Sequence, residues 1–228
     1  MPISGVWKTY LNRASRAAEE QREQRRKRTT GAHTTRPIED TAMVRRWLDI
    51  ARDHDRDSRQ GGASWYLLLV IGFNTGLRIS DIIGLRVGDI RGREYIVTIE
   101  GKTDKERRVL VRRDVGKRID ELLAGRDPDE YALQSRQCAP GTGERRPISR
   151  QRAYAIVKEI AARAGYQDHV GCHTMRKTYA WSLFDASDRN ITLVQKALNH
   201  ESQAATMHYL GLDQRDIDEV ASRMRRMI

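Results

Sequence analysis

The sequence predicts an α+β fold that is mainly α-helical, with one small antiparallel β-hairpin. Apolar residues recur at helical spacing along most of the chain after Glu39. This period changes once, where the β-branched stretch 95–100 is followed by a turn and by a second strand-like stretch, 107–111. With 228 residues, of which 39% are hydrophobic, the chain is long enough to bury a core of its own.

The expected helices begin with an amphipathic segment from Glu39 and a segment from Ser64 to Phe73 that is apolar on all sides. Gly76 is expected to end the second segment. Ser149 and Thr192 are expected to cap later helices at their N-termini. The later segments in order are a short helix around residue 80, helices at 114–124, 149–165, 173–185, 193–199, 202–210 and 213–227, and a long loop at 126–147.

The charge of the chain favours nucleic acid as a partner. The net charge is +11 and the pI is near 10.0, and more than half of the excess lies between Met1 and Arg36. Residues 5–28 fit either a solvated helix or disordered arm, or a basic arm that follows the phosphate backbone of DNA. Residues 29–37 fit a linker. An anionic membrane surface is a weaker alternative partner.

Several classes of protein are disfavoured by composition. Cys138 and Cys172 have no Cys-x-x-Cys partner, so we expect neither a disulfide framework nor a structural zinc site. The first residues contain no apolar core of a signal peptide, and the longest apolar run, 65–73, is too short to span a bilayer. The expected location is the cytoplasm, at the nucleoid when the protein is bound to DNA, with no membrane partner.

Two short stretches place an arginine where an anion could bind. In His173-Thr-Met-Arg176 the two side chains share one face of a helix, and the helix start itself favours an anion. In Thr75-Gly-Leu-Arg78-Ile-Ser-Asp81 the arginine follows a glycine break, and the carboxylate of Asp81 could hold its guanidinium. Each stretch alone also fits an ordinary surface pair.

Tyr209, within Thr206-Met-His-Tyr-Leu210, is the residue that could form a covalent bond to a phosphate. A single tyrosine near a chain end is usually a packing residue, so its role depends on the groups upstream. The phenol has an ordinary pKa of about 10 and is a poor nucleophile in that state. We expect nearby cations to favour the phenolate.

In their order and spacing these motifs resemble the catalytic domain of the tyrosine recombinases, the phage integrase family, over about residues 38–212. The matching pieces are Thr-Gly-Leu-Arg78-Ile-Ser-Asp81, the turn Gly101-Lys102, His173-Thr-Met-Arg176-Lys, Leu198-Asn-His200 and Thr206-Met-His-Tyr209. Asp81 stands where the family more often has glutamate. The shorter carboxylate is still expected to orient Arg78.

The resemblance implies a tyrosine-recombinase fold and a site-specific DNA recombinase or integrase. Such an enzyme cuts and rejoins strands through a 3′-phosphotyrosyl intermediate that stores the bond energy, so no metal, ATP or other cofactor is expected. The implied roles are Tyr209 as nucleophile, Arg78 and Arg176 as the phosphate clamp, His173 and His200 in proton transfer, and Lys102 as the acid for the leaving 5′-hydroxyl.

Some positions have more than one interpretation. The catalytic lysine of the turn could be Lys105, although Lys102, directly after a glycine, matches the family better. A metal site at His169 and His173 would require a single helix that runs through Gly171. A glycine inside a helix is unfavourable, so we do not expect this metal site. We also expect contacts with DNA from Lys105, Arg107 and Lys177.

Three segments are expected: a basic arm and linker at 1–36, the catalytic domain at 37–212, and a C-terminal helix at 213–228. That helix could pack on its own domain or dock on a neighbouring subunit. The family usually has a larger N-terminal domain that clamps DNA. Here a basic helix could substitute for it, or the chain could be a minimal recombinase or a fragment.

The expected partner is double-stranded DNA, with assembly as a dimer or tetramer on it and accessory DNA-bending proteins as further partners. Binding through phosphates should weaken with salt. Two alternatives stay open: a type IB topoisomerase-like nicking and rejoining enzyme, and a non-catalytic DNA-binding protein on the same fold. The complete set of site residues argues against the second, because a decayed site should lack a member.

Overall fold

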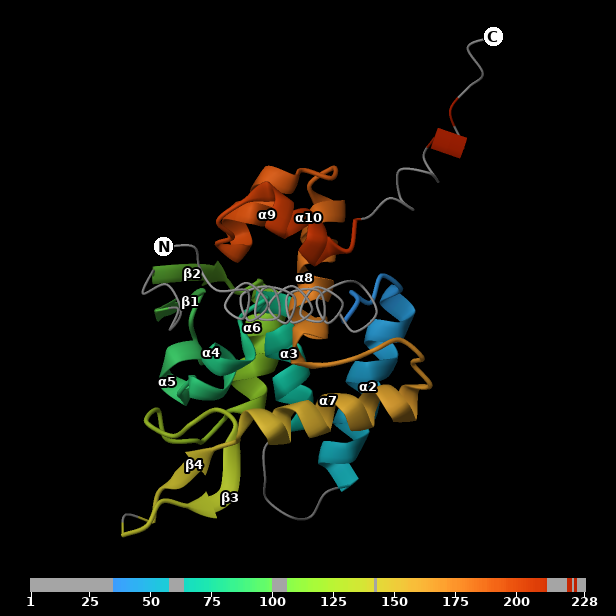
Figure 1. The fold of residues 1–228 in the computed structure, drawn as a ribbon. Coiled ribbons are helices and arrows are strands. Elements are labelled where there is room, and N and C mark those ends of the chain that lie inside the picture. The colour runs from blue at the N-terminus through green and yellow to red at the C-terminus, as the bar shows by residue number, and fades with distance from the viewer. Residues whose placement is uncertain are drawn as a thin grey trace, which may run out of the picture. The chain divides into compact units, whose positions relative to one another are not determined.

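The computed structural model describes residues 35–57, 64–99, 106–141, 143–212, 221–222 and 224. The chain divides into two compact units, Met1–Thr35 and Arg36–Ile228, and the fold below is that of the second. Its elements, labelled in Figure 1, are α2 (Thr41–Asp57), α3 (Trp65–Thr75), α4 (Ile79–Gly84), α5 (Val87–Ile90), β1 (Tyr95–Ile99), β2 (Glu106–Leu110), α6 (Arg113–Leu122), β3 (Gln134–Cys138), β4 (Arg145–Pro147), α7 (Arg150–Ala164), α8 (Cys172–Ala186), α9 (Ile191–Leu198) and α10 (Gln203–Leu210).

Helices dominate the unit and two small antiparallel sheets accompany them, which confirms the predicted α+β class. Three expectations lie outside the described residues: the basic arm at 5–28, the turn that carries Lys102 and Lys105, and most of the C-terminal helix at 213–227. Among the described helices, none has the length and apolar character needed to cross a bilayer.

Polar side chains mark where several helices begin. Ser149 caps α7 as predicted, because its hydroxyl accepts a hydrogen bond from the third following N–H, and Ser64 and Ser202 do the same for α3 and α10. The prediction that Thr192 caps α9 is wrong. The Asn190 side chain accepts the N–H groups of Thr192 and of the next residue, so the helix begins two residues earlier than predicted, at Ile191.

The predicted hairpin is confirmed, and the structure contains a second, separate hairpin. β1 pairs antiparallel with β2, with Tyr95 opposite Leu110 and Ile99 opposite Glu106. The predicted loop at 126–147 is wrong in part, because it contains the β3–β4 hairpin. The β3 sequence Gln-Ser-Arg-Gln-Cys holds no β-branched or aromatic residue, so the compositional signal of a strand is absent there.

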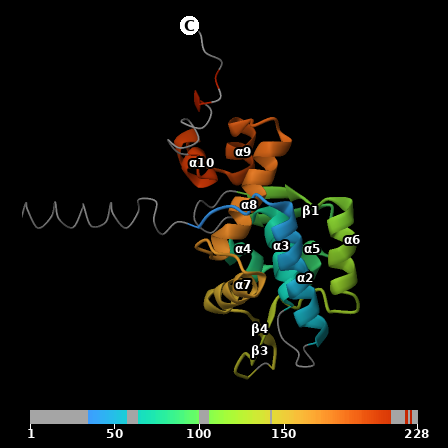
Figure 2. The same ribbon diagram turned by 90° about the vertical axis from the view of Figure 1, so that its right-hand side faces the viewer.

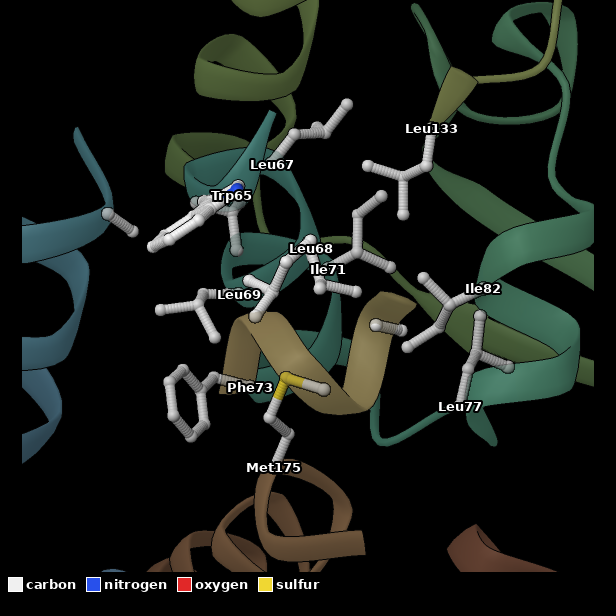
Figure 3. Packing of buried hydrophobic residues seen from close by; sticks show 14 of the residues in the cluster. Trp65, Leu67, Leu68, Leu69, Ile71, Phe73, Leu77, Ile82, Leu133 and Met175 are labelled. Atoms are coloured by element: carbon white, nitrogen blue, oxygen red, sulfur yellow. The ribbon is translucent and has the colours of Figure 1, made fainter. Parts of the chain in front are cut away.

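The main core is built around α3, which packs against α2, α6 and α8. Nine of its eleven residues are buried, which explains why the segment is apolar on all sides. Met175 points from α8 into this cluster (Figure 3). A Cβ atom on Gly72 would lie only 2.5 Å from the Met175 sulfur, so glycine here permits the close approach of α3 and α8.

A smaller apolar cluster joins the second half of α8 to α9 and α10, which lie together at one end of α8 in both views (Figures 1 and 2). Its buried members are Ala180, Phe184, Val194, Leu198 and Leu210. Tyr209 packs against the same cluster. Because α8 belongs to both clusters, its N-terminal half, which carries His173 and Arg176, is anchored in the main core through Met175, and its C-terminal half helps to position the helix of Tyr209.

Candidate active site

Arg78 lies at the sharp junction between α3 and α4. Gly76 ends α3 in the left-handed conformation, with φ at 56°, and a Cβ atom there would lie 2.2 Å from the ring of Tyr179 on α8. Glycine is therefore required both by the backbone angle and by the space. Arg78 follows as the N-cap residue of α4, half-buried.

Arg176 ties two segments of the site together. Its side chain is only 2% exposed. One guanidinium nitrogen donates to the carbonyl of Gly76 at 2.6 Å, and the other donates to the carbonyl of Leu198 at 2.8 Å. The first carbonyl lies two residues before Arg78 and the second lies two residues before His200. Arg176 thus holds in place the backbone that precedes both side chains.

Tyr209 lies in the last turn of α10 and meets residues from α8 and from the end of α9. Its hydroxyl is 3.5 Å from Nδ1 of His173. The His200 ring lies edge-on to the phenol ring, with centroids 5.0 Å apart. The Lys177 ammonium lies 5.2 Å from the centre of the same ring. The helix of Tyr209 therefore brings its hydroxyl close to His173 and its ring close to His200 within a single chain.

A hydrogen bond defines the tautomer of His200. The buried Thr206 hydroxyl donates to the carbonyl of Ser202 at 3.1 Å, and its oxygen is also 3.1 Å from His200 Nδ1. Because the hydroxyl proton is used on Ser202, Nδ1 of His200 is the donor to Thr206. Nε2 is then the acceptor nitrogen of the neutral ring.

The hydroxyl of Tyr209 keeps its proton at neutral pH. Burial raises the pKa of Tyr209 to about 12, while the positive charges of Arg176, Arg78 and Arg107 and a hydrogen bond with Arg176 act to lower it. The expected effect of the cations is therefore present, but in the free protein burial outweighs it and the hydroxyl stays protonated. Any reaction of this oxygen needs a proton acceptor.

His173 has the properties of such an acceptor. Partial desolvation lowers the pKa of its imidazole, and the charges of Arg176, Lys177 and Arg78 lower it further. All four contributions act in the same direction, so the ring is neutral over the physiological range and one of its two nitrogens can accept a proton.

The lowered pKa of His173 predicts a loss of stability in mild acid. In the unfolded chain this imidazole takes up a proton near pH 6.5, whereas in the folded chain its pKa is lower. As the pH falls below about 6.5, the unfolded state binds the proton first, and the free energy of unfolding falls. Denaturant unfolding of the wild type and of His173→Gln between about pH 8 and pH 5 measures this. The wild type should lose stability relative to the variant, and a difference that does not change with pH would contradict the prediction.

A cleft of about 860 Å³ opens at this site. Arg78 and His173 line it together with Asp81, the outer face of β1 and Arg150, the first residue of α7. The sequence motifs do not single out Arg150. Its position directly after the N-cap Ser149 is a signal that could have indicated it, because the start of a helix favours anions.

The remaining positions have varied surroundings. Asp81 accepts a hydrogen bond from Ser80 on one oxygen, while its other oxygen is buried with no hydrogen-bond partner among the described residues, so orientation of Arg78 stays a prediction. Arg107 and Lys177, expected on DNA, are only 5% and 7% exposed, and their charged groups face backbone carbonyls and the Tyr209 ring. His169 lies outside α8, which begins at Cys172.

Comparison with known proteins agrees with this geometry. Residues 44–215 match the phage integrase family, so the chain belongs to that family. The probable integrase/recombinase YoeC of Bacillus subtilis is 36% identical over 149 residues, which cover 65% of this chain and 78% of YoeC. The tyrosine recombinase XerD of Corynebacterium glutamicum is 31% identical over 153 residues, which cover 65% of this chain and 48% of XerD. The chain thus spans about half the length of the matched Xer recombinase.

Solved structures share the fold. The XerA recombinase superposes with a TM-score of 0.60 at 21% identity, over 85% of this chain and 68% of XerA. The catalytic domain of bacteriophage HP1 integrase superposes with a TM-score of 0.52 at 16% identity, over 83% of this chain and 95% of that domain. At these identities the likeness concerns the fold, which is that of a tyrosine recombinase catalytic domain.

Proposed function

We propose that this protein is a site-specific DNA recombinase that cuts and rejoins strands through a covalent bond between Tyr209 and a 3′-phosphate. The observation that carries the proposal is the 3.5 Å approach of the Tyr209 hydroxyl to His173 beside two arginines. A phosphodiester gains negative charge on its non-bridging oxygens when it is attacked. Arg78 and Arg176 would stabilise that charge, and Arg176 is already held by two carbonyls.

The step itself balances without an external energy source. The Tyr209 oxygen forms a bond to phosphorus and gives its proton to His173, whose lowered pKa keeps it ready to accept. The bond to the 5′-oxygen breaks, and that oxygen takes a proton from a general acid, the role that the family resemblance gives to Lys102. One phosphodiester is exchanged for another, so no ATP is required, and the two arginines take the charge-stabilising role that a metal ion could otherwise have. A 5′-hydroxyl of a second strand then reverses the reaction.

Double-stranded DNA is the proposed partner, in the cytoplasm where DNA is available. The solved relative XerH was crystallised with its difH substrate, and lambda integrase was crystallised as a dimer on a core site. Those facts concern these two proteins, and they support the same partner here. The net charge of +11 supports it independently. Dimers or tetramers on DNA, aided by DNA-bending proteins, are part of the same proposal.

A covalent trapping experiment tests the proposal. The wild-type protein is incubated with a library of nicked duplexes with a randomised centre, so that the released fragment diffuses away and the adduct accumulates. Adducts are separated on a denaturing gel, their DNA is sequenced, and the modified peptide is mapped by mass spectrometry. We expect a DNA 3′-phosphate on Tyr209. No adduct with any duplex, or an adduct on another residue, would refute the proposal.

A second duplex separates recombination from the topoisomerase-like alternative. When two different intact duplexes that both carry the selected site are mixed with the protein, a recombinase should give hybrid strands. A topoisomerase-like enzyme would cut each duplex and restore only the parental strands. A non-catalytic DNA-binding protein would give no adduct and would still retard the library in a native gel.

A further inference from the structure

The inward face of β2 carries an arginine. Arg107 alternates with Val109 along the strand, and both side chains are buried, the arginine at 5% exposure. A buried guanidinium is maintained only where other groups satisfy its charge and its donors. The partners of Arg107 therefore indicate its role.

Those partners are the last carbonyls of α3. One guanidinium nitrogen of Arg107 donates to Gly76 at 3.1 Å, and the other donates to Thr75 at 3.2 Å. The carbonyls at a helix C-terminus have no partner within the helix, so a planar fork can bind two of them at once. The two hydrogen bonds fasten β2, the strand that follows the predicted turn with Lys102, to the segment that leads into Arg78.

The Gly76 carbonyl also accepts the hydrogen bond from Arg176 at 2.6 Å. Two arginines from different elements thus share one acceptor. Arg176 continues to the Leu198 carbonyl, so a chain of hydrogen bonds leads from β2 through Gly76 to the end of α9. Arg78 and His200 follow the two ends of this chain by two residues each.

We propose that Arg107 is a positioning residue, which does not contact DNA but fixes the backbone that places Arg78 and Arg176 around one phosphate. This inference rests on the proposed function, because it assigns Arg107 an effect on strand cleavage. It replaces the expected contact between Arg107 and DNA. A residue of this kind should change the rate of cleavage and leave DNA affinity unchanged.

The test compares three variants on the duplex that the wild type selects from the nicked library. Arg107→Met removes the fork, and Arg107→Lys keeps the charge but provides a single donor centre. Arg108→Met removes a charge from the next residue, which is exposed and lies over the Tyr95 ring, without touching Thr75 or Gly76. At saturating DNA, Arg107→Met should form the adduct about 100-fold more slowly, as expected for a misplacement near 1 Å. Arg107→Lys should fall between this variant and the wild type, and Arg108→Met should cleave like the wild type.

Binding and leaving-group chemistry distinguish the possible causes of a slow rate. If Arg107 held a DNA phosphate, Arg107→Met would raise the dissociation constant and flatten its dependence on salt, which would overturn the proposal. A substrate with sulfur in place of the 5′-bridging oxygen needs no proton on its leaving group. The slow rate should persist on this substrate. A normal rate would mean that Arg107 acts through the leaving-group acid, which would also overturn the proposal.

Hydrogen exchange gives a readout that does not depend on cleavage. The backbone amides from Leu77 to Asp81 should exchange faster in Arg107→Met and Arg107→Lys than in Arg108→Met. If amide exchange from Leu77 to Asp81 and the rate of adduct formation are both unchanged in an Arg107 variant that folds, the positioning role is refuted. If the wild type itself forms no adduct, the proposed function fails, and the exchange data still decide whether Arg107 holds this segment.

Discussion

Tyr209→Phe should abolish the covalent adduct without changing the fold or DNA affinity. The substitution removes one oxygen, the atom that lies 3.5 Å from His173 Nδ1. It keeps the ring that packs against His200 and Lys177. Loss of a covalent nucleophile lowers a rate by roughly a million-fold, so no adduct should be detected on the selected duplex. The free energy of unfolding should change by about 1 kcal/mol or less, because a single hydrogen bond is lost.

The matched control is Tyr154→Phe. Tyr154 is 42% exposed on α7, lies against Lys158 and is not among the residues that line the cleft. This variant loses the same atom, and it should form adducts at the wild-type rate. An adduct that survives Tyr209→Phe would mean that another residue is the nucleophile. Loss of DNA binding in Tyr209→Phe would mean that the hydroxyl acts in binding, and the loss of adduct would then say nothing about chemistry.

The elements of the fold are largely local in origin, which is why the sequence predicts them. The all-apolar segment of α3, the Ser149 cap of α7 and the glycine that ends α3 each depend on residues within one or two turns. The β3–β4 hairpin differs because its strands are polar and short. The pairing of β3 with β4 depends on contact between two segments, and the amino-acid composition of neither segment predicts a strand.

The candidate site also combines features that depend on local sequence with features that depend on packing. The residues of the recombinase motifs are visible in the sequence, and the structure brings Tyr209, His173 and His200 together. The pKa of Tyr209 was not predictable in this way, because it depends on whether packing of α10 outweighs the charges of the arginines. That balance is a property of the assembled clusters.

Arg107 is an intermediate case. The sequence suggests a DNA contact because the residue is charged and lies after the turn with Lys102. The same sequence places Arg107 in phase with Val109 and Val111, two residues that face the core. On a strand, side chains two apart point to the same side. The alternation along the strand therefore predicts that this arginine is buried, whereas its charge alone suggests that it is exposed.

Gly76→Ala should damage both stability and cleavage. The new methyl group would meet the Tyr179 ring at 2.2 Å, and alanine is disfavoured at a φ of 56°. Overpacking and backbone strain together should lower the free energy of unfolding by roughly 2–4 kcal/mol. A backbone shift that relieves the clash moves the carbonyl shared by Arg107 and Arg176. Adduct formation should therefore slow by about 100-fold or more in the folded protein.

Gly165→Ala separates the two causes. Gly165 ends α7 as Gly76 ends α3, with a φ of 72°, but no atom lies within 4 Å of a Cβ atom there. This variant should lose only about 1–2 kcal/mol from the left-handed conformation and should cleave DNA at the wild-type rate. Denaturant unfolding and single-turnover cleavage measure both effects. Equal losses of stability in the two variants, with cleavage intact in Gly76→Ala, would show that neither the contact with Tyr179 nor the shared carbonyl positions the arginines.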